Sequence, residues 1–118
     1  MTEHDKHAVR AFLRNFKRLI REGNFFVLNR EANNEALIHL GINQAERRRM
    51  LLDLSVTDYS SGPDPDVAGD GYVWTFGKTI EDIEVYIKIK TVRPPSEIAK
   101  CISFHKAQTP LHYPFRSQ

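Results

Sequence analysis

Residues 83–92 read IEVYIKIKTV, and apolar and polar side chains alternate along them. An alternation with a period of two is typical of a β-strand with one face on a hydrophobic core and the other on polar surroundings. The apolar positions are Val85, Ile87 and Ile89, and the polar positions are Glu84, Tyr86, Lys88 and Lys90. We therefore expect a strand over residues 83–92 with a chemically distinct polar face.

Two further strands are predicted beside this one. Residues 72–76 (YVWTF) precede it, with a turn expected over residues 77–82, and residues 98–105 follow a break at residues 93–96 that contains two prolines. These segments predict an antiparallel meander. Residues 60–71 (SSGPDPDVAGDG) are rich in glycine, proline and aspartate, which is typical of a loop.

Helical patterns dominate the N-terminal half. Apolar residues recur at helical spacing over residues 6–22, and further helices are expected over residues 31–40 and after Asn43, which forms a capping-box pattern with Glu46. A short strand is expected over residues 25–28. Helices followed by a meander, without βαβ alternation, predict an α+β fold: one domain over residues 1–118, with an antiparallel sheet packed against N-terminal helices.

Composition narrows the class of protein. The chain has 118 residues and one cysteine, Cys101, which lies in an apolar run and is expected to be a buried thiol. The absence of an apolar stretch of about 20 residues and of a signal-peptide pattern predicts a soluble, cytoplasmic protein without a membrane partner. Residues 85–118 contain six basic side chains and one acid, whereas residues 56–84 contain one base and seven acids. This segregation favours a polyanionic partner, although solvated strand lysines would produce the same pattern.

Three polar residues are candidates for catalysis. Tyr86 and Lys88 are two apart on one strand and share a face. Strand parity separates Cys101, Ser103 and His105 from Lys100, Ile102 and Phe104, so His105 joins Tyr86 and Lys88 if Ile102 and Phe104 face the core. Histidine can exchange protons near neutral pH, and lysine can bind phosphate. This set suits RNA cleavage in which a ribose 2′-hydroxyl attacks the adjacent phosphate. The alternative is an ordinary surface with a strand-end histidine and a packing tyrosine.

No metal or cofactor is expected. The acids Asp64, Asp66 and Asp70 have a spacing that somewhat resembles calcium ligands, but the glycine position and closing glutamate of an EF-hand are absent. Phosphate-binding glycine loops and nucleophilic triads are also absent from the sequence.

The segments LDLSVTDY (52–59), YVWTFGK (72–78), EVYIKIK (84–90) and AKCISFH (99–105) together resemble the MqsR-type toxins of bacterial type II toxin–antitoxin systems. The resemblance implies a RelE-like fold, ribosome-independent endonucleolytic cleavage of mRNA, and inhibition by a cognate antitoxin protein. It also assigns catalysis to Tyr86, Lys88 and His105. The family's lysine meets Ser60 or Ser61 here, its glutamine meets Thr75, and His105 replaces a lysine.

Other residues are therefore expected to bind the RNA: Lys78, Lys90, Lys106, Tyr113 and Arg116. The C-terminal segment PLHYPF (110–115) contains two prolines that stiffen it, and we expect it to fold back over the sheet as a wall of the RNA groove. Two alternatives to the enzyme remain. One is a non-catalytic module that binds RNA or an acidic protein on the same fold, and the other is an interaction domain whose charges only solvate it.

Overall fold

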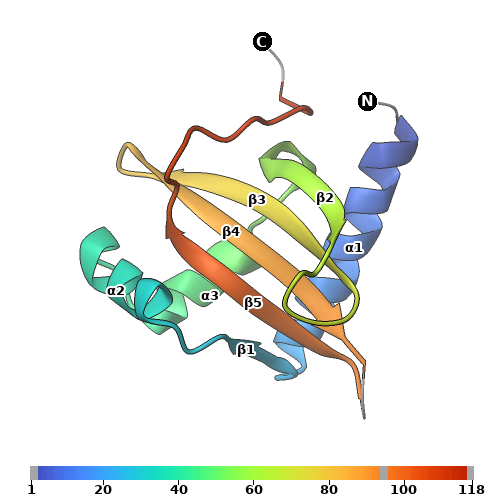
Figure 1. The fold of residues 1–118 in the computed structure, drawn as a ribbon, viewed down its shortest axis with the longest axis horizontal. Helices are drawn as coiled ribbons and strands as arrows, with labels where there is room; N and C mark the ends of the chain where they lie inside the picture. Colours follow the sequence, from blue (N-terminus) through green and yellow to red (C-terminus); the bar gives the residue numbers. More distant parts are fainter. Residues whose placement is uncertain (1–2, 94–95, 117–118) are drawn as a thin grey trace.

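The computed structural model describes residues 3–93 and 96–116 (Figure 1). The order of elements is α1 (Glu3–Arg21), β1 (Phe25–Val27), α2 (Glu31–Leu40), α3 (Gln44–Leu52), the 3₁₀ turn η1 (Val56–Asp58), β2 (Tyr59–Pro65), β3 (Tyr72–Ile80), β4 (Ile83–Val92) and β5 (Ile98–Lys106). The strands form one sheet in the order β1-β5-β4-β3-β2. Among the strand pairs of the described residues, β1–β5 is parallel and the other three are antiparallel. The predicted α+β class with N-terminal helices is confirmed.

Helices α1 and α3 lie over one face of this sheet, α2 lies beside the edge of β5, and the helices leave the other face open (Figure 1). Phe16, Leu19 and Ile20 of α1 are almost fully buried and belong to the same hydrophobic cluster as Ile87 and the other apolar residues of β4. The strand prediction for residues 83–92 therefore holds in both its bounds and its buried face. Within the described ranges, none of the helices combines the length and apolar character needed to cross a bilayer.

Local signals explain where the shorter helices begin and end. The Asn43 side chain accepts a hydrogen bond from the Glu46 amide at 2.8 Å, and the Asn43 amide donates one to the Glu46 carboxylate at 3.0 Å. This reciprocal pair is the predicted capping box at the start of α3. Gly41 ends α2 in the left-handed conformation, with φ of 67°.

The predicted loop over residues 60–71 is partly wrong, because β2 occupies Tyr59–Pro65 and pairs with β3. The pairing is irregular, with register shifts on both sides of Ser61. An edge strand tolerates glycine and proline at such irregularities, and for that reason its composition is typical of a loop. Residues 66–71 alone remain outside the two strands.

The predicted turn over residues 77–82 is also too long. Strand β3 continues to Ile80, and a two-residue hairpin turn joins it to Ile83. Glu81 and Asp82 both have positive φ, at 46° and 71°. Tight hairpins require such angles because the twist of the turn must match that of the strands. Gly77, which suggested the turn, lies instead within the sheet.

A β-bulge in β5 changes which residues face the core. Lys88 pairs with Ser103 and Ile89 pairs with Cys101, so Ile102 is the extra residue. Cys101 and Phe104 consequently both belong to the hydrophobic cluster, whereas Ile102, although buried, does not. The predicted placement of Ile102 with Phe104, opposite Cys101, is wrong. The expected burial of Cys101 is confirmed, and it raises the pKa of the thiol to about 12.

Candidate functional site

The open face of the sheet carries two adjacent rows of residues that run across the strands. The first, called the Tyr86 row, consists of Gly77, Tyr86 and His105. The second, called the Lys88 row, consists of Ser61, Thr75, Lys88 and Ser103. Neighbouring rows on one face are two residues apart along a strand, or about 7 Å. Strand pairing therefore brings the three predicted catalytic residues together.

Tyr86 and His105 are direct cross-strand partners, and their rings stack. The ring centroids are 5.5 Å apart and the planes are inclined by 28°. The His105 Nδ1 lies 3.0 Å from the carbonyl oxygen of Lys106. A carbonyl can only accept, so this contact makes Nδ1 the donor, and Nε2 of the neutral ring then carries the lone pair. The backbone thereby selects the tautomer in which Nε2 can accept a proton.

Lys88 lies among hydroxyl groups. Thr75 and Ser103 are its two cross-strand neighbours, and both are largely buried. The longer Lys88 side chain is more exposed than either of them. Lys88 forms no ion pair within the described part of the chain. An ammonium without a carboxylate partner, flanked by hydroxyl donors, is suited to binding a phosphate.

A hollow of about 330 Å³ adjoins both rows. Thr75, Tyr86 and Lys88 line it from the sheet, Ser61 lines it from β2, and Leu111 lines it from the C-terminal segment. The two positions at which the sequence departs from the MqsR-type pattern, Ser61 and Thr75, thus face each other across β2 and β3 at this hollow. Asp64 and Asp66 also line the hollow, so a ligand in it would contact the tyrosine, the lysine and several hydroxyls beside two carboxylates, of which Asp66 is paired with Lys90.

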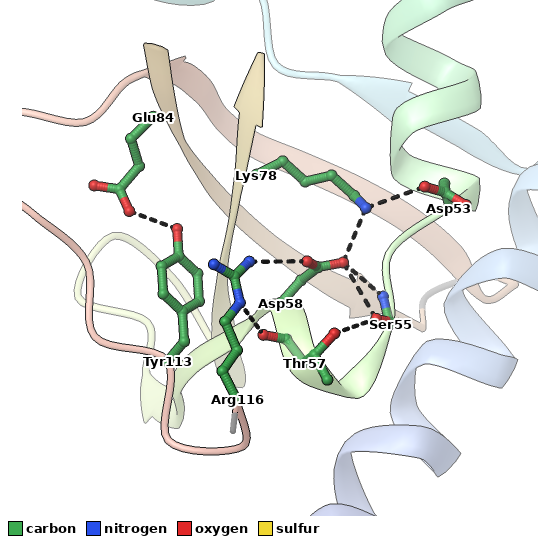
Figure 2. Close-up of polar contacts among 8 residues, drawn as sticks. All are labelled: Asp53, Ser55, Thr57, Asp58, Lys78, Glu84, Tyr113 and Arg116. Atoms are coloured by element: carbon green, nitrogen blue, oxygen red, sulfur yellow. Dashed lines mark hydrogen bonds and ion pairs between the residues drawn. The ribbon is translucent and has the colours of Figure 1, made fainter. Parts of the chain in front are cut away.

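The C-terminal segment folds back over the sheet, as the sequence predicts. Glu84 anchors it: the Leu111 amide donates to one carboxylate oxygen at 3.0 Å and the Tyr113 hydroxyl donates to the other at 2.6 Å (Figure 2). The Tyr113 hydroxyl also lies over Gly77, where an added Cβ would overlap it and would lie 2.6 Å from Leu111 Cδ1. Because Gly77 has no side chain, the C-terminal segment can cross the sheet at this position, next to Tyr86.

The far end of this segment is tied to η1. Arg116 donates to the Thr57 carbonyl at 2.9 Å and to Asp58 at 3.3 Å, and its guanidinium stacks on the Tyr113 ring at 3.6 Å (Figure 2). Burial, followed by the hydrogen bond to Glu84, raises the pKa of Tyr113. The two predicted RNA-binding residues Tyr113 and Arg116 thus use their polar groups to hold the segment in place.

Lys78 does not lie on the open face. It pairs with Val85, whose side chain is in the core, and its ammonium lies 3.0 Å from Asp58 and 3.1 Å from Asp53 (Figure 2). Burial lowers the pKa of Lys78, but the hydrogen bonds to Asp58 and Asp53 outweigh burial and raise it overall. The structure therefore gives Lys78 a structural ion pair on the helix side of the sheet, away from Tyr86 and Lys88.

Lys90 shares the face of Lys88 but is almost fully buried. Its ammonium donates to the Asp66 carboxylate and to the Asp70 carbonyl, both at 2.6 Å. The hydrogen bond from Lys90, with a second from the Ala68 amide, holds the pKa of Asp66 below its usual range. Lys90 therefore fastens the β2–β3 loop over the sheet. Lys106, the last of the five predicted RNA-binding residues, is exposed, but it pairs with Val85 as Lys78 does, so it lies on the helix side of the sheet and not on the open face with His105.

Among the described residues, no three histidine, cysteine, aspartate or glutamate side chains are grouped so that they could hold a metal ion. What the open face offers is a proton acceptor, a phenol, an ammonium and hydroxyls beside a hollow. Comparison of the chain with models of protein families, with curated proteins and with solved structures found no match.

Glu84, Leu111 and Gly77 are the residues of this site that sequence reasoning missed. Glu84 is 27 residues from Leu111, and nothing in the local pattern distinguishes it from any other exposed strand acid. Gly77 carried a signal, because a glycine inside a strand pattern often marks a close approach of another segment. The glycine and the polar residues after it predicted a turn there instead.

The contact of Tyr113 with Glu84 gives a first testable prediction. Tyr113→Phe removes a hydrogen bond to a carboxylate, and Gly77→Val places a side chain where the Tyr113 hydroxyl lies. We expect either change to loosen the C-terminal segment and to lower the hydrogen-exchange protection of the Leu111 amide by about tenfold. Tyr72→Phe, at an exposed tyrosine of β3, is the matched control. Unchanged protection in both variants would show that these contacts do not hold the segment.

Proposed function

We propose that the protein is a metal-independent endoribonuclease, the toxin of a type II toxin–antitoxin pair with a RelE-like, MqsR-like fold. The observation that carries the proposal is the stacked pair of Tyr86 and His105 beside the unpaired Lys88, on a sheet face that the helices leave open. Its substrate is mRNA, its site of action is the cytoplasm, and its regulator is a cognate antitoxin protein.

The side chains can divide the chemistry between them. His105 Nε2 takes the proton of the ribose 2′-hydroxyl as that oxygen bonds to the adjacent phosphorus. Lys88 stabilises the charge that accumulates on the phosphoryl oxygens. The leaving 5′-oxygen must gain a proton, and the side chains beside His105 that can donate one are Tyr86 and Lys88. No step requires a metal ion.

The hydroxyls of the Lys88 row support the same function. In the family that the sequence resembles, a lysine and a glutamine are expected at the positions of Ser61 and Thr75. Here both side chains line the hollow beside Lys88, where their hydroxyls can donate to phosphate oxygens or to a ribose. The replacement removes one positive charge, so Lys88 is the cation on which phosphate binding at this hollow depends.

The test is the cleavage of end-labelled RNA by the purified protein. We expect cleavage that EDTA does not inhibit and that leaves 2′,3′-cyclic phosphate ends, because the 2′-oxygen is the nucleophile. Lys88→Ala should slow cleavage by at least tenfold, whereas Arg14→Ala, which removes an exposed cation of α1, should leave the rate unchanged. Cleavage that requires a divalent ion, or that leaves 2′-hydroxyl and 3′-phosphate ends from the outset, would overturn the proposal.

A second candidate is a non-catalytic RNA-binding module. It is favoured by the internal contacts of Lys78, Lys90 and Arg116, which leave few of the predicted cations for the transition state. The same assay separates the two functions. Protein that retards RNA in a gel without cutting it is the binding module.

A further inference from the structure

A third row crosses the open face next to the Lys88 row. Lys90 pairs with Lys100 of β5, and Lys100 pairs with Phe26 of β1. Lys90 is neutralised by Asp66, but the ammonium of Lys100 lies over the Phe26 ring, 5.8 Å from its centroid. Phe26 is 42% exposed although it is a large apolar side chain. This row therefore ends in an exposed aromatic ring with a cation above it.

A hollow of about 710 Å³ lies at this end of the sheet. Four basic side chains line it, Arg30, Lys90, Arg93 and Lys100, against the two acids Asp66 and Asp70. Asp66 forms an ion pair with Lys90, so the other charged residues of the lining are three bases and one acid, Asp70. Tyr72, at the start of β3, also lines it and is 60% exposed. Phe12 and Trp74 also line the hollow, and Tyr72 shares the face of Trp74, so the hollow extends around the end of the sheet to its helix side. Phe26 does not line the hollow but lies next to Lys100, which does.

The position of this surface relates it to the candidate catalytic rows. Lys90 follows Lys88 by two residues on the same face of β4, which places the third row about 7 Å from the Lys88 row and about 13 Å from Tyr86. The β2–β3 loop, which Lys90 fastens, lines both hollows through Asp66. The two hollows therefore lie side by side and share Asp66 of this loop in their linings.

We propose that this surface, formed by Phe26, Arg30, Tyr72, Arg93 and Lys100, binds the single-stranded RNA that flanks the cleaved phosphate. The three cations contact successive phosphates, and the two exposed rings stack on unpaired bases. The combination of cations with exposed aromatic rings favours single-stranded RNA over an acidic peptide, which would use the cations and leave the rings exposed to water. The statement that the bound RNA is the substrate rests on the proposed function. The statement that this surface binds RNA does not.

Binding is tested with a fluorescently labelled single-stranded RNA and the full chain carrying His105→Ala, so that the RNA stays intact. We expect Phe26→Ala and Tyr72→Ala each to weaken binding by about tenfold through lost stacking. Arg30→Ala, Arg93→Ala and Lys100→Ala should each weaken it and also reduce the slope of log affinity against log salt by about 0.7. Arg14→Ala, on an exposed face of α1, is the matched control and should change neither. A circular dichroism spectrum of each variant verifies its fold.

The outcomes separate this inference from the proposed function. If the wild type cuts RNA but these five variants bind it as tightly as the control does, the inference is overturned and the ribonuclease stands. If RNA binding depends on these residues but no cleavage occurs, the inference stands and the ribonuclease falls. Binding of a polyglutamate peptide with the same dependence, and no binding of RNA, would overturn the inference in favour of a protein partner.

Discussion

His105→Ala is expected to slow RNA cleavage by a factor of about 10² to 10⁴, the usual contribution of a general acid or base. The backbone contact of Nδ1 with the Lys106 carbonyl leaves Nε2 to accept the proton of the 2′-hydroxyl, and alanine has no group that can replace it. The measurement is the single-turnover rate on end-labelled RNA with protein in excess. This rate reports the chemical step without product release.

Two further variants make this prediction specific to the imidazole. His39→Ala removes an exposed histidine of α2 and should leave the rate unchanged. His105→Lys installs the residue that the MqsR-type pattern has at this position, and we expect it to retain more activity than His105→Ala because it restores a proton-exchanging cation next to Tyr86. A His105→Ala protein that cuts at the wild-type rate would remove His105 from the mechanism.

Asn33→Ala is expected to lower the free energy of unfolding by about 3 kcal/mol. Asn33 of α2 is fully buried and makes three hydrogen bonds to the backbone. Its amide donates to the carbonyls of Leu28 at 3.0 Å and Ile102 at 2.9 Å, and its oxygen accepts from the Phe104 amide at 2.9 Å. The Leu28 carbonyl still accepts from the Arg30 amide, but alanine leaves the Ile102 carbonyl and the Phe104 amide without this partner, and each unsatisfied buried group costs about 1–3 kcal/mol.

Urea denaturation of Asn33→Ala and Asn34→Ala checks this prediction. Asn34 is the neighbouring residue, but it is exposed and its side chain bonds to the exposed side chain of Asn29, so its replacement should change stability by less than about 0.5 kcal/mol. Equal effects of the two substitutions would contradict the role assigned to Asn33. Because Asn33 holds both Ile102 and Phe104, it also fixes the bulge and the strand end that carries His105.

Periodicity carried most of the fold prediction. The bounds of β4 and α2 agree with those expected from the sequence, because in each the apolar spacing and the flanking break come from neighbouring residues. The capping box of α3 was equally local, since Asn43 and Glu46 are three residues apart. Such signals depend only on the chain near them, and a sequence displays them directly.

Local signals could not predict strand β2 or the contacts that anchor the C-terminal segment. Tyr59–Pro65 becomes a strand because β3 provides a partner for its backbone, although its own composition favours a loop. The segment over the open face is held by Glu84 and Asp58, at separations of 27 and 58 residues from Leu111 and Arg116. Contacts at this distance along the chain are created by the fold and leave no local pattern.

The candidate site shows the same division within one strand. The sequence by itself determined that Tyr86 and Lys88 share a face, because the period of a strand is two. Strand parity also placed His105 opposite Phe104, and the pairing with Tyr86 puts it on the open face. Only the tertiary structure decided that the extra residue is Ile102, which turns Cys101 into the core and Lys100 onto the open face beside Phe26. The physical reason is that a bulge is a property of two paired strands, and it reverses the facing of every residue on one side of it.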